Sequence, residues 1–310
     1  MTTNSNATGR AIRRAQKAAV RRLERSIDEA SAQMQVLYDQ ALDDIQQFVA
    51  GLAQPDGTVP ASALPEVERF VRNRLQQVAD ARNRLLTTSI EQGASFAVNA
   101  WQAAGTVVPL AQVGSEAVDF VRNFIDENGL QLSDRLWRVD NAARTRITQA
   151  IESAVIQGQS ASQAVRDLLG RGQPLPDDLL SKAGLAAVNR INAEARDALF
   201  TGQGNPVFNA ERLFRTEINR AFGETSVAAA AQHPDVIGVR YVLSPRHPRF
   251  DICDMHASVN MHGLGPGVYP TDNHPWPAHP KTFSIPEPVF FDEITDEDRA
   301  GRESRQSFLQ

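Results

Sequence analysis

The chain has 310 residues, of which 42% are hydrophobic, a net charge of −5 and a single cysteine. It is long and apolar enough to bury a sizeable core, and its lone cysteine excludes an intramolecular disulfide framework. No apolar run approaches the roughly 20 residues of a membrane-spanning helix, and the start MTTNSNATGR lacks the apolar segment of a secretory signal, so we expect a soluble protein made in the cytoplasm.

Two long amphipathic helices are predicted at the N-terminal end. Apolar residues recur at intervals of three and four over 11–52, which indicates one helix of a hairpin or a coiled-coil-like pair. Glycine and proline in 51–62 end that helix, and the same periodicity then predicts a second helix over 65–104, with Pro65 in its first turn. Segment 105–114 ends it, so 1–114 is assigned to a long-helix region.

Shorter helices are predicted in the next region, 115–232. Ser160 and Gln163 resemble a capping box, which indicates that a new helix starts there. The predicted helices cover 115–126, 133–157, 160–170, 176–201 and 208–231.

The composition changes after His233. All six histidines and Cys253 lie within 233–279, and ten of the seventeen prolines lie within 234–288. Proline fixes φ and removes a backbone donor, which favours turns, loops and short strands over regular helix. Strands are predicted at 236–244 and at 281–285, the second extending to the PVFF run. The expected fold is mostly α: a long N-terminal helical hairpin or bundle, a small, loop-rich α+β module at 233–290, and a polar tail at 291–310.

Four side chains of this module have the spacing of a zinc site. Cys253-x2-His256 is followed after seventeen residues by His274-x4-His279, and two such pairs can converge tetrahedrally on zinc. His247, Asp251 and Asp254 are further candidates for the ligand set or its surroundings. In the alternative interpretation, each histidine caps a turn or bonds a backbone carbonyl, and Cys253 is a small buried residue.

A catalytic interpretation also exists. Asp251, Asn273 and His274 suggest a metal-dependent nuclease, in which a histidine activates water and the metal stabilises charge on phosphate. The sequence has no glycine-rich phosphate loop, serine elbow or HExxH helix that would indicate another reaction.

The first predicted helix begins with a basic segment. Residues 10–25 hold seven arginines and lysines against Glu24 alone, which indicates a phosphate-bearing or acidic partner; the alternative is a solvated helix face. The candidate contact residues are Arg10, Arg13, Arg14, Arg21 and Arg22.

Residues 160–286 resemble a known family. An Arg-Thr-Glu helix (215–217), then DICDMHA (251–257), GLGPGVYP (263–270) and HPWPAHPKTFSIP (274–286) are similar to the C-terminal module of phage head morphogenesis proteins, the Mu F-like minor capsid family.

The resemblance places this chain's residues in the family's motif. Cys253 and His256 take the positions of a C-x-x-C-like pair, and His279 that of the closing histidine. The two closing cysteines fall at Thr282 and Ser284, whose hydroxyls are poor zinc ligands. The resemblance therefore implies that the zinc site is either rebuilt around His274 or lost, in which case Asp251, Asp254, His256 and His279 hold the loops by hydrogen bonds.

The resemblance also implies a role and partners. It implies a non-enzymatic minor capsid protein in the virion, near the portal vertex, made in the bacterial cytoplasm and in some relatives ejected with DNA. Its long helices would contact the portal protein, other head proteins or further copies of the chain, and its basic segment the packaged DNA or the portal, with no membrane involved. A zinc-dependent nucleic-acid-processing enzyme is the first alternative and a toxin-delivery adaptor with the same module is the second.

Two residues of the Arg-Thr-Glu helix are expected to clamp the loops. Arg215 and Glu217 are two positions apart, so they cannot pair with each other on a helix. We expect Glu217, which lies near Arg220, to anchor the helix to the loop segment through an arginine or a histidine.

Overall fold

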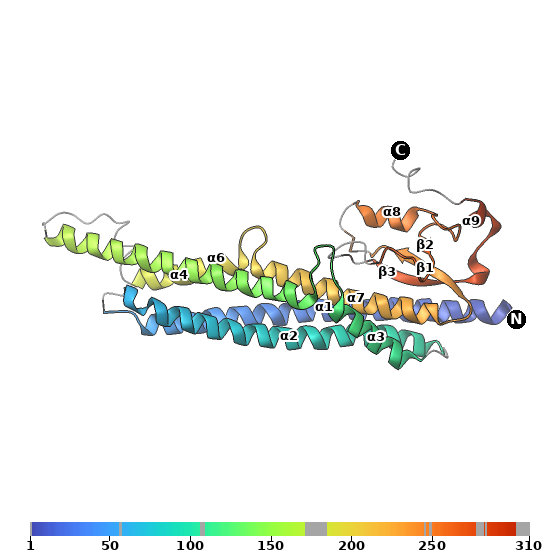
Figure 1. Cartoon of the computed structure of the whole chain (residues 1–310), viewed down its shortest axis with the longest axis horizontal. Helices are drawn as coiled ribbons and strands as arrows, with labels where there is room; N and C mark the ends of the chain where they lie inside the picture. The colour runs from blue at the N-terminus through green and yellow to red at the C-terminus, as the bar shows by residue number, and fades with distance from the viewer. Residues whose placement is uncertain are drawn as a thin grey trace. The chain divides into compact units, whose positions relative to one another are not determined.

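The computed structural model describes residues 2–55, 58–105, 109–170, 185–244, 246–247, 250–276, 282 and 284–301. Long helices come first and a small three-stranded sheet with short helices follows, which confirms the predicted fold class (Figure 1). The elements are α1 (Thr2–Gly51), η1 (Ala61–Ala63), α2 (Leu64–Ala103), α3 (Leu110–Asn123), α4 (Leu132–Gly170), α6 (Leu185–Phe200), α7 (Pro206–Ala231), β1 (Val236–Val242), α8 (Ile252–Ser258), β2 (Val268–Tyr269), β3 (Ile285–Phe290), η2 (Phe291–Glu293) and α9 (Asp296–Ala300).

The sequence-based helix boundaries are close for α2 and α7, whereas α1 starts nine residues before its predicted start at residue 11. The predicted break near Ser160 is wrong, because α4 continues to Gly170 as one helix. The first residues of the predicted 176–201 helix lie outside the described residues, and α6 begins at Leu185. The predicted absence of helix in the proline-rich segment is also wrong, since α8 forms there over a stretch without proline.

The chain divides into two compact units, and neither is continuous in sequence. The first unit comprises Met1–Ser31, Leu86–Leu132 and Arg212–Gln310, and the second comprises Ala32–Leu85 and Ser133–Glu211. Long helices such as α1 and α2 contribute residues to both. Among the described residues, no helix is both long and apolar enough to cross a membrane.

The second unit contains a buried ion pair between helices. The side chain of Arg82, on α2, is fully buried. Its Nη2 donates to Asp140 Oδ2 on α4 at 3.0 Å, and its Nη1 donates to the Tyr38 hydroxyl on α1 at 3.3 Å. These bonds matter because an isolated buried guanidinium is strongly unfavourable without a charged partner. One side chain thus ties three helices of this unit together.

The first unit holds the sheet and the helices that surround it. Its strand order is β2-β1-β3, and both pairings are antiparallel. Pro286 and Pro288 interrupt no internal ladder because β3 is an edge strand. Figure 1 shows the three strands side by side, and α8 contacts β1. We call β1, α8, β2, β3 and their connections the C-terminal module.

Close backbone packing brings α2 and α7 together within this unit. A Cβ added at Gly93 on α2 would lie 2.7 Å from the carbonyl oxygen of Ile218 on α7, so only glycine fits without a shift. Gly223, further along α7, meets the indole of Trp276 in the same way, and a Cβ there would lie 1.9 Å from the indole nitrogen. Helix α7 therefore contacts both α2 and the loop that precedes β3.

We predict that Asp140→Ala lowers the free energy of unfolding by about 3 kcal/mol, because it leaves the buried Arg82 guanidinium without its carboxylate. Urea unfolding followed by circular dichroism measures this cost. Asp43→Ala is the matched control, because it removes an exposed carboxylate from α1 and should change stability by less than ~0.5 kcal/mol. Equal effects of the two substitutions would contradict the assigned role of the ion pair.

Candidate functional site

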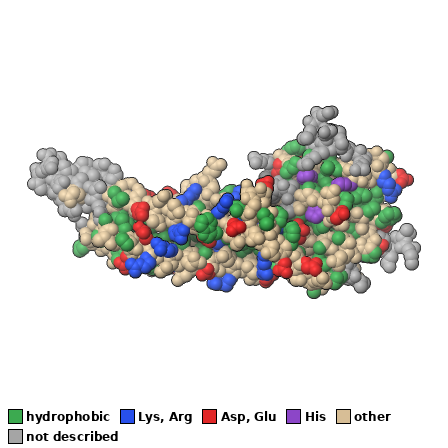
Figure 2. All heavy atoms as spheres, in the orientation of Figure 1, with side chains coloured by type: hydrophobic (Ala, Val, Ile, Leu, Met, Phe, Trp, Pro, Cys, Tyr) green, Lys and Arg blue, Asp and Glu red, His purple; other side chains and the backbone are tan. Residues whose placement is uncertain are grey.

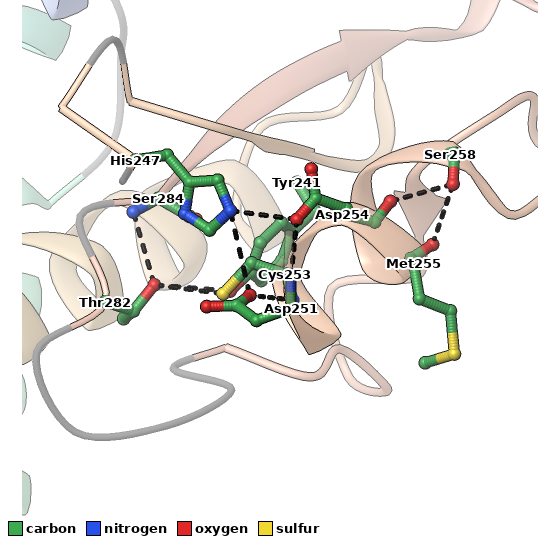
Figure 3. A network of polar contacts seen from close by, with 9 residues as sticks. All are labelled: Tyr241, His247, Asp251, Cys253, Asp254, Met255, Ser258, Thr282 and Ser284. Atoms are coloured by element: carbon green, nitrogen blue, oxygen red, sulfur yellow. Dashed lines mark hydrogen bonds and ion pairs between the residues drawn. The ribbon is translucent and has the colours of Figure 1, made fainter. Parts of the chain in front are cut away.

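A buried chain of hydrogen bonds joins the main parts of the C-terminal module. The Tyr241 hydroxyl, on β1, donates to Cys253 Sγ on α8 at 3.1 Å. It also lies 3.4 Å from Thr282 Oγ1, and this oxygen lies 3.5 Å from the sulfur. All three side chains are buried, and Figure 3 shows the Thr282 hydroxyl directed at the sulfur of Cys253. Strand, helix and the segment before β3 thus meet at one phenol.

The environment of Tyr241 keeps this centre uncharged. Burial raises the pKa of the Tyr241 hydroxyl well above its usual value, and the hydrogen bond with Cys253 raises it further. A protonated phenol beside a buried thiol is a stable hydrogen-bonded pair without a charge to compensate. The arrangement is suited to holding structure rather than to supplying a nucleophile.

Thr282 is in turn fixed from two sides. Its hydroxyl accepts a bond from the Ser284 backbone N–H at 3.3 Å. Its carbonyl oxygen accepts a bond from Asn219 Nδ2 on α7 at 2.8 Å, and both residues are buried. The hydrogen-bonded chain therefore runs from α7 through Thr282 to Tyr241 and Cys253.

His256, at the end of α8, bonds to strand β2. Its Nδ1 lies 3.1 Å from the Tyr269 hydroxyl, which also donates to the His256 carbonyl oxygen at 3.2 Å. Both side chains are buried. The pairing places His256 in the core of the module, as the loop-holding interpretation expects.

A second polar group lies at the start of α8. Asp251 is its N-cap and accepts from the Cys253 backbone N–H at 2.7 Å, while Asp254 accepts from the Asp251 backbone N–H at 2.8 Å. This reciprocal capping box satisfies two of the N–H groups left open at a helix start. His247 Nε2 lies 2.8 Å from Asp254 Oδ2. The hydrogen bond from the Asp251 backbone N–H lowers the pKa of the Asp254 carboxyl, and the hydrogen bond with His247 lowers it further.

The described residues bring together a different ligand set from the predicted zinc quartet. Histidine side chains are visible on the surface of the module in Figure 2. The ligand atoms of His247, Asp251 and Asp254 lie within 4.8 Å of one another, and one imidazole with two carboxylates could hold a divalent metal.

The predicted quartet of Cys253, His256, His274 and His279 is only partly placed. Its three described members do not form a converging group of this kind. His274 Nδ1 accepts from the Trp276 backbone N–H at 3.3 Å, and burial lowers the pKa of the ring. His279 lies outside the described residues, so the complete quartet stays a prediction.

The Arg-Thr-Glu helix is α7, and its two charged residues have separate partners. Arg215 lies 4.0 Å from Asp28 on α1, and Glu217 accepts from Arg220 Nε at 3.1 Å within α7. Arg220 also stacks over the Phe124 ring, 3.8 Å from its centroid. Glu217 and Arg220 thus pair within α7, whereas Asn219 makes the described bond from α7 to the Thr282 segment.

The loop after β1 is tied to α1 by charge. Arg246 Nη2 lies 3.0 Å from Asp28 Oδ2, and its Nε lies 3.8 Å from Glu24 Oε2. The Ser244 hydroxyl donates to Glu24 Oε1 at 3.2 Å. The hydrogen bond with Asp28 raises the pKa of Arg246 above its usual value, and the negative charge of Glu24 adds to this effect. These exposed pairs position the loop, although each alone contributes about 1 kcal/mol or less.

The basic segment of α1 separates into two kinds of residue. Arg13 is directed toward its own chain: its Nη1 lies 2.6 Å from Glu293 Oε1, and its Nε lies 3.6 Å from Glu287 Oε1. The other candidate contact residues are exposed, namely Arg10, Arg14, Arg21 and Arg22. Arg13 therefore holds β3 and η2 to α1, whereas the exposed group is available to a partner.

Sequence reasoning missed several residues of this site. Nothing in the local pattern marks Tyr241, Tyr269 or Asn219 as partners of the module's polar groups, because each contact joins distant parts of the chain. The capping box of α8 was visible as Asp251 followed three residues later by Asp254, with an acidic residue in place of the usual Glu or Gln.

Comparison of the chain with protein-family models, with curated proteins and with solved structures found no match.

We predict that Tyr241→Phe lowers the free energy of unfolding by about 1–2 kcal/mol, because it leaves buried polar groups of Cys253 and Thr282 with one partner fewer. Denaturant unfolding measures the cost. A thiol reagent gives a second readout, since Cys253 is the only cysteine and should react faster in the variant. Ser258→Ala is the control, because the Ser258 hydroxyl bonds only carbonyls of α8. Unchanged stability and labelling would contradict the role of the Tyr241 hydroxyl.

We predict that Glu224→Gln stabilises the protein at pH 8 but not at pH 4.5. Burial raises the pKa of Glu224 to about 7, with Arg220 offsetting part of the effect. The folded state therefore binds this proton more tightly than the unfolded chain. The protonated Glu224 side chain contributes its full stability below the unfolded pKa, and this stability is lost as pH rises toward 7. Above pH 7, replacing the charged carboxylate with Gln should therefore raise the free energy of unfolding by on the order of 3 kcal/mol.

Urea unfolding across this pH range tests the effect of Glu224. Glu29→Gln, an exposed carboxylate on α1, provides the control and should show no such pH-dependent gain. A gain of equal size at both ends of the range would indicate a packing effect instead of a titration.

Proposed function

We propose that this protein is a minor head protein of a tailed bacteriophage or prophage that associates with the portal vertex during head assembly. The observation that carries the proposal is the meeting of Cys253 and Thr282. These residues are 29 positions apart in the sequence, and the sulfur of Cys253 lies 3.5 Å from the hydroxyl oxygen of Thr282. The resemblance assigns Cys253 to the C-x-x-C-like pair and Thr282 to a cysteine position of the closing motif, so their proximity supports the alignment of this chain with the phage module.

The module supports a role in assembly rather than in turnover. Cys253 is fully buried, and its sulfur accepts a hydrogen bond from the Tyr241 hydroxyl, so it is not exposed to a substrate. His256 is buried against Tyr269, and the carboxylates of Asp251 and Asp254 cap α8. Asp251, which the catalytic interpretation would use, thus already caps α8, and its neighbours Cys253 and His256 already bond to the strands.

The second unit offers apolar side chains for contacts with other proteins. Trp137 on α4 is 63% exposed, and Ile156, further along the same helix, is 57% exposed. Exposed tryptophan is typical of residues that dominate the binding energy of protein interfaces. We infer that these long helices contact the portal protein, other head proteins or further copies of the chain.

Proteomic analysis of purified heads tests the proposed function. We predict that the protein is present in procapsids and virions and co-purifies with the portal. Trp137→Ser should lower its incorporation by about tenfold or more, because interface tryptophans contribute on the order of 2 kcal/mol. Trp137→Phe keeps an apolar aromatic ring and should restore most of it. Heads that lack the wild-type protein would overturn the proposal.

A nuclease assay separates this function from the enzymatic alternative. A minor head protein should leave plasmid DNA intact with and without added divalent metal. Metal-dependent nicking that is abolished by a chelator and by Asp254→Asn would favour the nucleic-acid-processing enzyme.

A further inference from the structure

The solvent side of the first part of α1 carries an unbroken row of cations. The row steps by four, three, four and four residues, which on a helix of 3.6 residues per turn keeps the side chains on one face. At 1.5 Å per residue, it extends over about 22 Å. All of its members are exposed, and we call them the basic face: Arg10, Arg14, Lys17, Arg21 and Arg25.

The basic face is not neutralised by the part of the chain that the structure describes. No carboxylate there lies within ion-pairing distance of these side chains, in contrast to Arg13 with Glu287 and Glu293. Residues 10–25 carry +6, and because the whole chain carries −5, the remaining residues carry −11. The basic face is thus a local concentration of positive charge on an otherwise acidic molecule, and its field favours a polyanion.

The residues around the basic face argue against a protein partner. Protein interfaces are built around an apolar or aromatic centre with charge at the rim. The exposed residues beside the row include only small apolar side chains, Ala11 and Ala18, and residues 10–25 contain no aromatic residue. Phosphate backbones need no such anchor, because cations and the counterions that they release supply most of the binding free energy.

The same composition indicates the kind of nucleic acid. Single strands are bound by stacking bases on aromatic side chains, which this face lacks. Base edges are read mainly by arginine, asparagine and glutamine held in a groove, and Gln16, the one amide in the segment, is buried. A straight row of cations on an exposed helix is suited to the backbone of a duplex and not to reading its sequence.

We infer that the basic face of α1 binds the phosphate backbone of double-stranded DNA without sequence preference. The inference rests on the proposed function for the source of that DNA, which would be the duplex packaged in the head. Binding of the purified protein to DNA is separable from its presence in heads, so the two conclusions can fail independently.

Fluorescence anisotropy of the full-length protein with a labelled duplex of about 30 base pairs tests the inference. If all five cations contact phosphates, the logarithm of the association constant should fall with that of salt with a slope of about −4.5. Affinity would then fall roughly 500-fold between about 50 and 200 mM salt. Two duplexes of unrelated sequence should bind equally, and both should bind more tightly than a single strand of the same length.

A triple variant and a matched control locate the binding surface. Arg10→Gln, Arg14→Gln and Arg21→Gln together should reduce the slope by about 2.7. The control Arg69→Gln, Arg84→Gln and Arg138→Gln removes the same charge from exposed positions on α2 and α4, and should keep the wild-type slope.

Four results would overturn the inference. They are no duplex binding at about 50 mM salt, an equal loss of affinity in the control variant, tighter binding to the single strand, and displacement of DNA by an acidic polypeptide as effective as unlabelled duplex. Protein that is found in heads but does not bind DNA would overturn this inference alone. Protein that binds DNA but is absent from heads would overturn only the proposed function.

Discussion

The C-terminal module depends on the hydrogen bond between the Tyr241 hydroxyl and the sulfur of Cys253. A module of three short strands and one short helix buries little apolar surface by itself, so polar contacts must fix how its parts pack. This bond joins β1 to α8, and Thr282 extends it to the segment before β3. Asn219 then connects that segment to α7. The small module is thereby attached to the long helices through one continuous buried network.

The network that holds the module together is built from hydroxyl groups and a single sulfur. Thiolates gathered in a core need a metal to offset their charge, whereas Thr282 and a protonated Tyr241 need only each other and a donor. Burial holds the phenol in its neutral form, and the Ser284 backbone N–H completes the bonding of Thr282. Tyr241, which no local pattern singles out, is the residue that makes this arrangement complete. Hydrogen bonds at this centre thus hold β1, α8 and the segment before β3 together.

The secondary-structure elements of this fold could be predicted from the sequence more fully than the contacts between them. Apolar periodicity identified α1, α2 and α7, because long amphipathic helices repeat the same pattern over many turns. The break predicted at Ser160 failed because a capping pattern also occurs inside helices, where packing decides. The sequence did not predict α8 near Cys253, because the surrounding prolines disfavour helix. The cap formed by Asp251 and Asp254 nevertheless starts a short helix between these prolines. Contacts such as Asn219 with Thr282 join residues 63 positions apart, and only the folded chain reveals them.

Helix α1 uses one charged segment for two purposes, and helical geometry separates them. Arg13 and Glu24 are eleven residues apart, close to three full turns, so they lie on the same side of the helix. Arg13 contacts Glu287 on β3, and Glu24 contacts Arg246 in the loop after β1. This side of α1 is therefore engaged by the module at both ends. The row from Arg10 to Arg25 lies further round the helix, opposite the buried residues Ile12 and Leu23. Because residues 10–25 already form helix, the basic face presents its cations in a fixed order along one side, which removes part of the entropic cost of binding.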